Sequence, residues 1–316
     1  MEPVMPTHPV VHTVVVTFNR KDLLRDCLRA NLDQDRPPDR LVLIDNASSD
    51  GTPQMLEQEG WLANERLLYR RLESNLGGAG GFRIGVEEAL AHGAEWIWLM
   101  DDDAIPEPDA LRQLLTRIDP SQPPALLASQ VLTAAGEIDI AHRSRVRHRS
   151  LWTHHIPARE YAQELIAADM VSFVGPLIHR QHAETCGLPR ADYFLYYDDH
   201  EFTHRVRRAG FPLWVVPGSR IRHLDQGRSL RHAMREQSWG WRMYYRVRNR
   251  VHWYRSIEPE ALSLLWRLML LFAVQWGLIL LRQPHKLHRS LLMFRAFSDG
   301  WQARLGKTID PATYEE

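Results

Sequence analysis

Three consecutive carboxylates, Asp101, Asp102 and Asp103, follow directly after an apolar run at residues 96–100. Such a run is typical of a buried strand, and like charges at its end repel one another unless a cation lies between them. Carboxylate oxygens are the ligands that Mg²⁺ and Mn²⁺ prefer, often together with substrate phosphates. In an extended chain Asp101 and Asp103 project to the same side. The triplet therefore predicts a divalent-cation site, with an acidic turn or helix cap as the alternative.

A second acidic pair, Asp198 and Asp199, lies among aromatic residues at the start of a helix predicted from about residue 198 to residue 210. The helix dipole favours carboxylates at such a position, so both could be caps. A carboxylate beside tyrosines and another acid can also have a raised pKa and accept a proton from a hydroxyl group. The pair is therefore a candidate for a general base.

Further downstream, His223 follows a strand predicted over residues 212–216 and the segment 219–222. A histidine at such a position is normally structural, and an imidazole that bound a metal would suit Mn²⁺ better than Mg²⁺. Arginines at positions 143, 145, 147 and 149 would share one face of an extended strand and could meet a diphosphate. A solvated loop explains the same arginines equally well.

Composition limits the class of protein. The chain has 316 residues, enough for one large α/β domain and an appendage, and its 39 basic residues balance 39 acidic ones. Nothing therefore indicates a polyanion partner, and the aromatic and basic segment at 239–250 matches no nucleic-acid-binding module. Two cysteines exclude a disulfide framework and suit a reducing cytoplasm. Residues 1–12 do not resemble an export leader.

The first hundred residues alternate between strand and helix patterns. Strands are predicted at 14–16, 41–44, 67–72 and 96–100, and helices at 21–32, 52–58 and 83–92. This alternation predicts right-handed βαβ units and a parallel sheet. Ligands of such sheets bind beyond the carboxyl ends of the strands. The polar segments that follow the four strands should therefore meet at one crevice.

Two of these segments suit nucleotide recognition. Asp45 could accept hydrogen bonds from a ribose or a base, and the glycine run at 77–81 would let backbone approach a ligand closely. A flexible connector is the alternative for that run. The run lacks the Lys-Ser/Thr ending of a P-loop, and it lies too far along the chain for the dinucleotide fingerprint.

The ordered set of motifs resembles the inverting glycosyltransferases of family 2, which have the GT-A fold. The motifs are Val-Val-Val-Thr-Phe-Asn-Arg at 14–20, Ile-Asp-Asn-Ala-Ser-Ser-Asp-Gly-Thr at 44–52, Asn-Leu-Gly-Gly-Ala-Gly-Gly-Phe at 75–82 and Trp-Leu-Met-Asp-Asp-Asp at 98–103. The third motif and the triple aspartate are most similar to those of bacterial UDP-galactofuranosyltransferases, with rhamnosyltransferases next. The resemblance covers roughly residues 12–255.

The resemblance implies a role for each candidate residue. Asp101 and Asp103 correspond to the ends of the family's Asp-X-Asp motif, and His223 to its third metal ligand, with Mn²⁺ or Mg²⁺ neutralising charge on the departing nucleoside diphosphate. Asp199 corresponds to the catalytic base, and Asp198 would help to orient the acceptor. The nucleotide pocket would be lined by Thr17, Asn19, Asp45, Asn75, Gly77, Gly78 and Asp102.

The expected architecture is an α/β GT-A domain over residues 1–255, with a Rossmann-like, mostly parallel sheet flanked by helices, and a helical membrane-proximal extension over 256–316. Residues 262–281 are mostly apolar and long enough to span a bilayer. Arg267 and Gln275 lie on a polar stripe that favours a helix lying at the membrane surface. A buried core helix and a transmembrane anchor are the alternatives.

The expected activity is metal-dependent, inverting transfer of a sugar, galactofuranose from UDP-galactofuranose, to a hydroxyl of a lipid-linked or cell-surface glycan. The protein would be cytoplasmic and peripheral on the inner face of the cell membrane, with no nucleic-acid partner. The alternatives are a dTDP-rhamnose-dependent rhamnosyltransferase and a non-catalytic nucleotide-sugar-binding scaffold. A sugar-nucleotide uridylyltransferase would need a phosphate-binding motif near the N-terminus, and the sequence shows none.

Overall fold

The computed structural model describes residues 8–146, 153–224, 240–257, 262–282, 284–310 and 314. The chain forms two compact units. The first comprises Met1–Arg190 and Asp199–Gln226, and the second comprises Ala191–Asp198 and Gly227–Glu316. The functional boundary that the sequence predicts between residues 255 and 256 stays a prediction.

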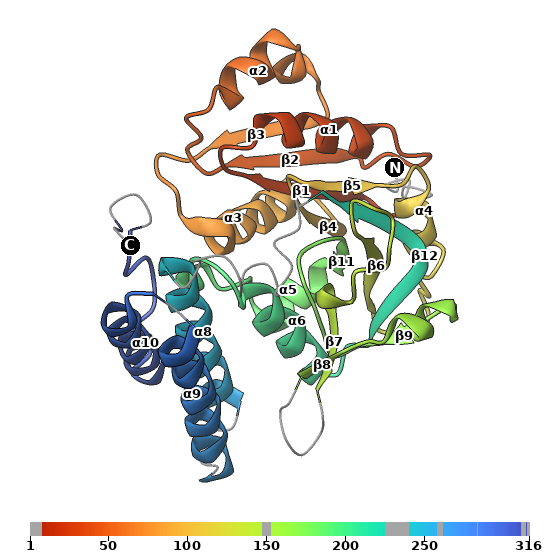
Figure 1. Cartoon of the computed structure of the whole chain (residues 1–316). Coiled ribbons are helices and arrows are strands. Elements are labelled where there is room, and N and C mark those ends of the chain that lie inside the picture. Colours follow the sequence, from red (N-terminus) through yellow and green to blue (C-terminus); the bar gives the residue numbers. More distant parts are fainter. Residues whose placement is uncertain are drawn as a thin grey trace. The chain divides into compact units, whose positions relative to one another are not determined.

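A nine-stranded sheet forms the centre of the first unit (Figure 1). Its order is β3-β2-β1-β4-β11-β6-β12-β5, and β9 pairs with β12. The strands β3, β2, β1 and β4 are parallel to one another, as are β6 and β12, whereas β11, β5 and β9 run antiparallel to their neighbours. The bounds are β1 Val11–Thr17, β2 Arg40–Asp45, β3 Leu67–Arg71, β4 Trp96–Asp101, β5 Ala104–Pro106, β6 Leu126–Leu132, β9 Ile166–Ala167, β11 Pro176–His179 and β12 Leu213–His223. The four predicted strands of the first hundred residues and their parallel pairing are confirmed.

Helices and a smaller sheet complete the first unit. The helices are α1 Lys21–Leu32, α2 Thr52–Gln58, α3 Gly77–Ala91, α4 Ala110–Leu115, α5 Arg180–Cys186 and α6 Asp198–Arg208. Short 3-10 turns are η1 Trp61–Ala63, η2 Ile140–His142, η3 Ala158–Ala162 and, in the second unit, η4 Ala191–Tyr193. The smaller antiparallel sheet has the order β10-β7-β8, with β10 Met170–Val171, β7 Arg143–Val146 and β8 Thr153–His155.

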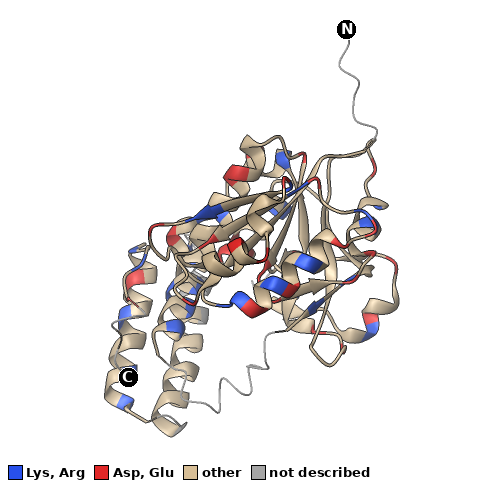
Figure 2. Cartoon of the chain, turned by 90° about the horizontal axis from the view of Figure 1, so that it is seen from above, with Lys and Arg blue, Asp and Glu red and all other residues tan. Residues whose placement is uncertain are grey.

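The apolar strands are explained by burial on both faces of the large sheet. Along β1, Val14 packs into a core that includes Phe82 of α3, whereas Val15 packs into a second core that includes Leu24 of α1. Because each face is covered by helices, successive residues of the strand are apolar rather than alternating with polar ones. In the ribbon of Figure 2, positions of acidic residues (red) and basic residues (blue) are interspersed along the helices.

The glycine-rich segment differs from the prediction. Helix α3 begins at Gly77, so the run 77–81 is helical rather than a connector, and the helix starts six residues before the predicted 83. A Cβ at Gly81 would lie 2.5 Å from Val16 Cγ1, and one at Gly85 would lie 2.3 Å from Val14 Cγ1. These two glycines therefore let α3 pack closely on β1.

The expected basic face at residues 143–149 is not formed by its two described arginines. Arg143 is fully buried and donates hydrogen bonds to the carbonyl oxygens of Ser129 and Val174. Arg145 pairs with Glu160 at 2.7 Å. Both guanidinium groups are engaged by the protein, while residues 147 and 149 lie outside the described residues.

Most described residues of the second unit are helical. Its helices are α8 Trp241–Ile257, α9 Leu262–Arg282 and α10 Lys286–Trp301. Helix α8 packs against α10, where Tyr244 Oη donates a 2.6 Å hydrogen bond to Asp299 Oδ2. Among the described residues, no helix combines the length and apolar character needed to cross a membrane.

His182 makes stability depend on pH. The side chain is fully buried, and its Nδ1 accepts a hydrogen bond from the backbone N–H of His179, while Nε2 lies 2.8 Å from the carbonyl oxygen of Pro124. Burial lowers the pKa of His182 from 6.5 to about 4. The unfolded chain therefore binds more protons between these values, and the contribution of neutral His182 is lost as the pH falls through that window.

We expect His182 to contribute a loss of unfolding free energy on the order of 2 kcal/mol between pH 7 and pH 4.5. Urea denaturation at several pH values measures it. His182→Gln should show a shallower decline with falling pH than the natural chain, whereas His8→Gln, at an exposed position, should not. Identical pH slopes for the natural chain and His182→Gln would contradict this assignment.

Candidate functional site

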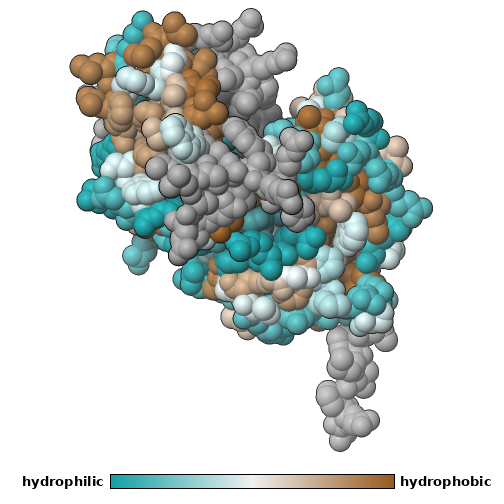
Figure 3. Space-filling view, turned by 90° about the horizontal axis from the view of Figure 1, so that it is seen from below, coloured by the Kyte–Doolittle hydropathy of each residue, from teal (hydrophilic) through white to brown (hydrophobic). Residues whose placement is uncertain are grey.

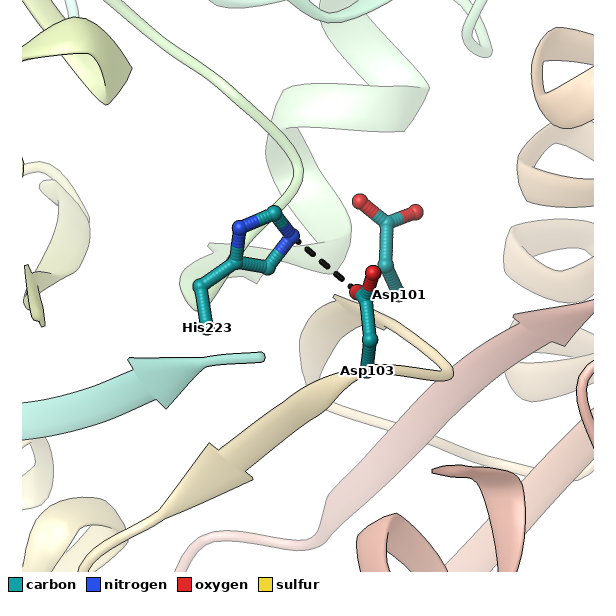
Figure 4. A group of neighbouring side chains, drawn as sticks. All are labelled: Asp101, Asp103 and His223. Carbon is teal, nitrogen blue, oxygen red and sulfur yellow. Dashed lines mark ion pairs between the residues drawn. The ribbon is translucent and has the colours of Figure 1, made fainter. Parts of the chain in front are cut away.

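Strand pairing brings the predicted metal ligands together. Asp101 ends β4 and Asp103 lies directly before β5, while His223 ends β12. Because β12 pairs antiparallel with β5 and His223 lies opposite Ala104, the imidazole is placed beside Asp103. One ligand atom from each of Asp101, Asp103 and His223 lies within 4.8 Å of the other two. Figure 4 shows the three side chains converging from these elements.

The donor set fits a divalent cation. Asp103 Oδ1 is buried and lies 3.0 Å from His223 Nε2, yet it has no hydrogen-bond partner. These two atoms form an ion pair, and with an oxygen of Asp101 they also lie close enough together to be ligands of one cation. Two carboxylates and one imidazole suit Mn²⁺, and the carboxylates also suit Mg²⁺.

The charges of the three consecutive aspartates also favour a bound cation. Burial, followed by the charge of Asp103, raises the pKa of Asp101 to about 8 and that of Asp102 to about 7. Burial acts in the same direction on Asp103, but the nearby His223 and Arg20 outweigh it and lower the pKa of Asp103. Asp103 is therefore the anionic member, and its neighbours ionise readily only when more positive charge is present.

Asp102 points to a different partner. Its Oδ2 accepts a 2.7 Å hydrogen bond from the hydroxyl of Thr17, at the end of β1. The two residues were predicted to line the nucleotide pocket, and the structure brings them into direct contact.

Arg20 and His142, to which the sequence motifs give no role, both lie beside the triad of Asp101, Asp103 and His223. Arg20 Nη1 lies 2.5 Å from Asp103 Oδ2 and 3.5 Å from Asp102 Oδ1. The ring of His142 packs edge-on against His223, with centroids 5.1 Å apart. Arg20 could have been found from the sequence, because it is the first charged residue after a strand that ends at the same edge. Nothing in the sequence indicated His142.

The remaining nucleotide candidates follow β1, β2 and β3. Asp45 is fully buried, and its carboxylate accepts hydrogen bonds from the backbone N–H of Ser48 and the hydroxyl of Tyr69. Asn19 has φ 54°, and its side-chain oxygen accepts a 2.7 Å hydrogen bond from the backbone N–H of Ser49. These bonds shape the loops at the sheet edge.

After β3, Asn75 lies in the loop, and Gly77 and Gly78 are the first two residues of α3. The side-chain oxygen of Asn75 accepts a 2.7 Å hydrogen bond from the backbone N–H of Gly77, the first residue of α3. Gly77 has φ 74°, which favours glycine, and a Cβ at Gly78 would meet no atom within 4 Å. Contact of these residues with a nucleotide stays a prediction.

The candidate base lies at the start of α6. Asp199 Oδ1 accepts a 2.7 Å hydrogen bond from the backbone N–H of His200, and the carbonyl oxygen of Asp199 accepts one from Thr203. Asp198 is buried. Three non-glycine residues just before the pair, Phe194, Tyr196 and Tyr197, have φ between 62° and 70°. Each such residue costs about 1–3 kcal/mol, and such strain clusters at functional sites.

Known proteins resemble this chain in sequence. The sequence model of the family described as "Glycosyl transferase family 2" matches residues 13–184. The chain is 33% identical over 207 residues to "Galactofuranosyltransferase GlfT1" of Mycolicibacterium smegmatis, which covers 64% of this chain and 67% of that protein.

Solved structures resemble the fold at lower identity. "GalNAc-T7 with UDP, GalNAc and Mn2+" matches with a TM-score of 0.57 and 17% identity over 81% of this chain and 52% of that one, so this chain spans about half of its length. "Mannosyltransferase PcManGT from Pyrobaculum calidifontis in complex with GDP-Man and Mn2+" has a TM-score of 0.55 and 17% identity, over 94% of this chain and 76% of that one. The expected GT-A class is thereby confirmed.

Metal binding should depend on pH. Because Asp101 has its pKa raised to about 8, a proton must leave before it can bind a cation, so Mn²⁺ affinity should fall as the pH drops from 8 to 6. Calorimetric titration with Mn²⁺ alone, at several pH values, measures this affinity.

Asp103→Asn should weaken Mn²⁺ binding by about tenfold or more, because one anionic ligand is lost. Asp109→Asn, outside the triad, is the matched control, and equal Mn²⁺ affinities for the two variants would refute the site.

Proposed function

This chain belongs to glycosyl transferase family 2, and we propose that it is a metal-dependent, inverting transferase that moves galactofuranose from UDP-galactofuranose to a hydroxyl of a lipid-linked or cell-surface glycan. The observation that carries the proposal is the convergence of Asp101, Asp103 and His223 at the sheet edge. The similarity to a protein named galactofuranosyltransferase supports the donor sugar.

Asp101, Asp103 and His223 would hold the cation, which would supply positive charge to the diphosphate as it leaves. Arg20 also brings positive charge to this place, since its guanidinium contacts Asp103 and Asp102. A guanidinium with a half-exposed side chain can also meet phosphate oxygens. We therefore assign the diphosphate to the space beside Asp103.

The nucleoside would lie along the ends of the first three strands. Asp45 lies opposite Thr17 in the pairing of β2 with β1, so the loops that follow these strands begin side by side. Backbone and side-chain groups of these loops would bind the base and ribose, as in other sheets whose ligands lie beyond the carboxyl ends. The residues concerned are Thr17, Asn19, Asp45, Asn75, Gly77, Gly78 and Asp102.

The proposed reaction is a single displacement with Asp199 as general base. The Asp199 carboxylate takes the proton of the acceptor hydroxyl, and the acceptor oxygen forms a bond to the anomeric carbon. The bond from that carbon to the diphosphate oxygen breaks on the opposite face, and UDP leaves with its electron pair. The anomeric configuration inverts and no covalent enzyme intermediate forms. Asp198 would help to orient the acceptor.

The second unit supports attachment to a membrane surface. Apolar side chains are exposed at helical spacing on α9, and the same holds for α10. They are Trp266, Leu270, Val274 and Leu281 on α9, and Leu287, Leu291 and Phe294 on α10, each between 46% and 81% exposed. Figure 3 shows brown, apolar surface gathered over these helices at the upper left. Exposed Lys286 and Arg295 flank it and suit anionic lipid. The side chain of Arg267, on the predicted polar stripe, lies outside the described ones.

Transfer assays should separate the donor and the base. We expect the natural chain, given Mn²⁺ and a polyprenyl-diphosphate-linked glycan, to use UDP-galactofuranose and not dTDP-rhamnose. Asp199→Asn should lower kcat by at least about 100-fold while UDP affinity stays unchanged, because a general base contributes about that much. Asp22→Asn, on the exposed surface of α1, is the matched control.

Full transfer by Asp199→Asn would remove the base assignment. Use of dTDP-rhamnose alone would favour the rhamnosyltransferase alternative. Donor binding without turnover of any acceptor by the natural chain would favour a non-catalytic scaffold.

Sedimentation with vesicles of phosphatidylcholine and phosphatidylglycerol tests membrane attachment. We expect the natural chain to bind them, and Leu281→Glu or Leu287→Glu to weaken binding by about tenfold, because a charge replaces an apolar side chain that would enter the lipid. Leu62→Glu is the matched control, since Leu62 is a similarly exposed leucine (49%) in the first unit. An equal loss of binding in Leu62→Glu, or no loss in any variant, would contradict the assignment of this surface.

A further inference from the structure

The segment that leads into the candidate base has an unusual backbone. Within Ala191–Tyr197, the non-glycine residues Phe194, Tyr196 and Tyr197 have φ of 62°, 66° and 70°. A Cβ clashes with backbone in this left-handed region, so such residues persist only where surrounding contacts impose the conformation. Asp198 and Asp199 follow directly in the chain.

The contacts that hold this backbone conformation come from the buried side-chain amide of Asn249. Nδ2 of Asn249, on α8, lies 2.9 Å from the carbonyl oxygen of Tyr193, 2.9 Å from that of Leu195 and 2.8 Å from that of Tyr196. Asn249 is fully buried. One side chain therefore gathers three carbonyl groups from within four residues.

Arg248 fixes the orientation of this amide. Its Nε donates a 2.8 Å hydrogen bond to Asn249 Oδ1, so the oxygen side of the amide is occupied and the NH₂ group must face the three carbonyls. Arg248 also donates to the carbonyl oxygen of Tyr193, at 2.9 Å, and to that of Gly306, at 2.6 Å. The left-handed segment is thus held by α8, which itself is tied to the C-terminal segment.

We propose that Asn249 is a positioning residue for the reaction. Its hydrogen bonds hold the backbone of residues 193–197 in one conformation, and this conformation sets the direction in which the chain continues to Asp199. The inference rests on the proposed function, because it takes Asp199 as the base. The printed ring contact of Tyr196 does not by itself impose the strained backbone. The Tyr196 ring lies 5.1 Å from the guanidinium carbon of Arg246, and such a contact requires no positive φ.

A matched pair of variants at Tyr196 tests the backbone apart from the buried amide. Tyr196→Asn and Tyr196→Val both remove the ring, but Asn tolerates the left-handed region and a β-branched residue does not. We expect kcat of the Asn variant to exceed that of the Val variant by about tenfold to 100-fold, as for a misplaced catalytic group. UDP affinity in Mn²⁺ should be equal in the two. Equal kcat values would overturn the proposal.

Asn249→Leu removes the hydrogen bonds at similar volume. It should lower kcat by a similar factor with little change in the KM for the donor, whereas Ser290→Ala, which removes the hydroxyl that accepts from Trp276 Nε1 in the same unit, should leave kcat unchanged. If Asn249→Leu does not fold, the Tyr196 pair decides. Unchanged kcat in a folded Asn249→Leu would also overturn the proposal.

Asp199→Asn, assayed in parallel, distinguishes a failure of the positioning role of Asn249 from a failure of the proposed function. Loss of transfer in Asp199→Asn together with normal kcat in Asn249→Leu would refute the positioning role alone. Full transfer in Asp199→Asn would refute the proposed function, on which the positioning role depends.

Discussion

The repulsion among three consecutive carboxylates at the end of β4, of which Asp102 and Asp103 are buried, is the constraint on which the candidate site depends. Asp101 and Asp102 have raised pKa values because burial and Asp103 oppose their ionisation. His223 and Arg20 relieve the repulsion only in part, by contacts with Asp103 at 3.0 Å and 2.5 Å. A divalent cation would complete the balance, and the phosphates of a donor bring the ligands that such a cation lacks.

The fold around this edge consists of elements that hold the acidic turn in place. The parallel strands β3, β2, β1 and β4 end together, and β12 returns to pair with β5 directly after the triplet. Burial on both faces explains the apolar strands, and glycines at positions 81 and 85 let α3 lie close to β1. The loops at the edge are then bonded to one another, as between Asn19 and Ser49.

Local patterns predicted the strands and the aspartates at the end of β4, because a run of consecutive apolar residues indicates both a buried strand and its length. The metal triad was predicted by resemblance, since His223 lies 120 residues after Asp103 and only strand pairing brings the two together. The run at 77–81 was misjudged as loop, because its glycines serve packing against β1, which no local pattern reveals. The burial of Arg143 could not be predicted for a similar reason, because its carbonyl partners lie in β6 and in the bend before β11.

The second unit is discontinuous in sequence, since Ala191–Asp198 is separated from Gly227–Glu316 by a return of the chain into the first unit. A chain truncated after β12 would keep the segment before Asp198 but lose Asn249 and Arg248, which hold its carbonyl groups. The C-terminal helices are therefore no detachable module. Deleting them to ease purification would remove the hydrogen bonds that hold the backbone before the acidic pair.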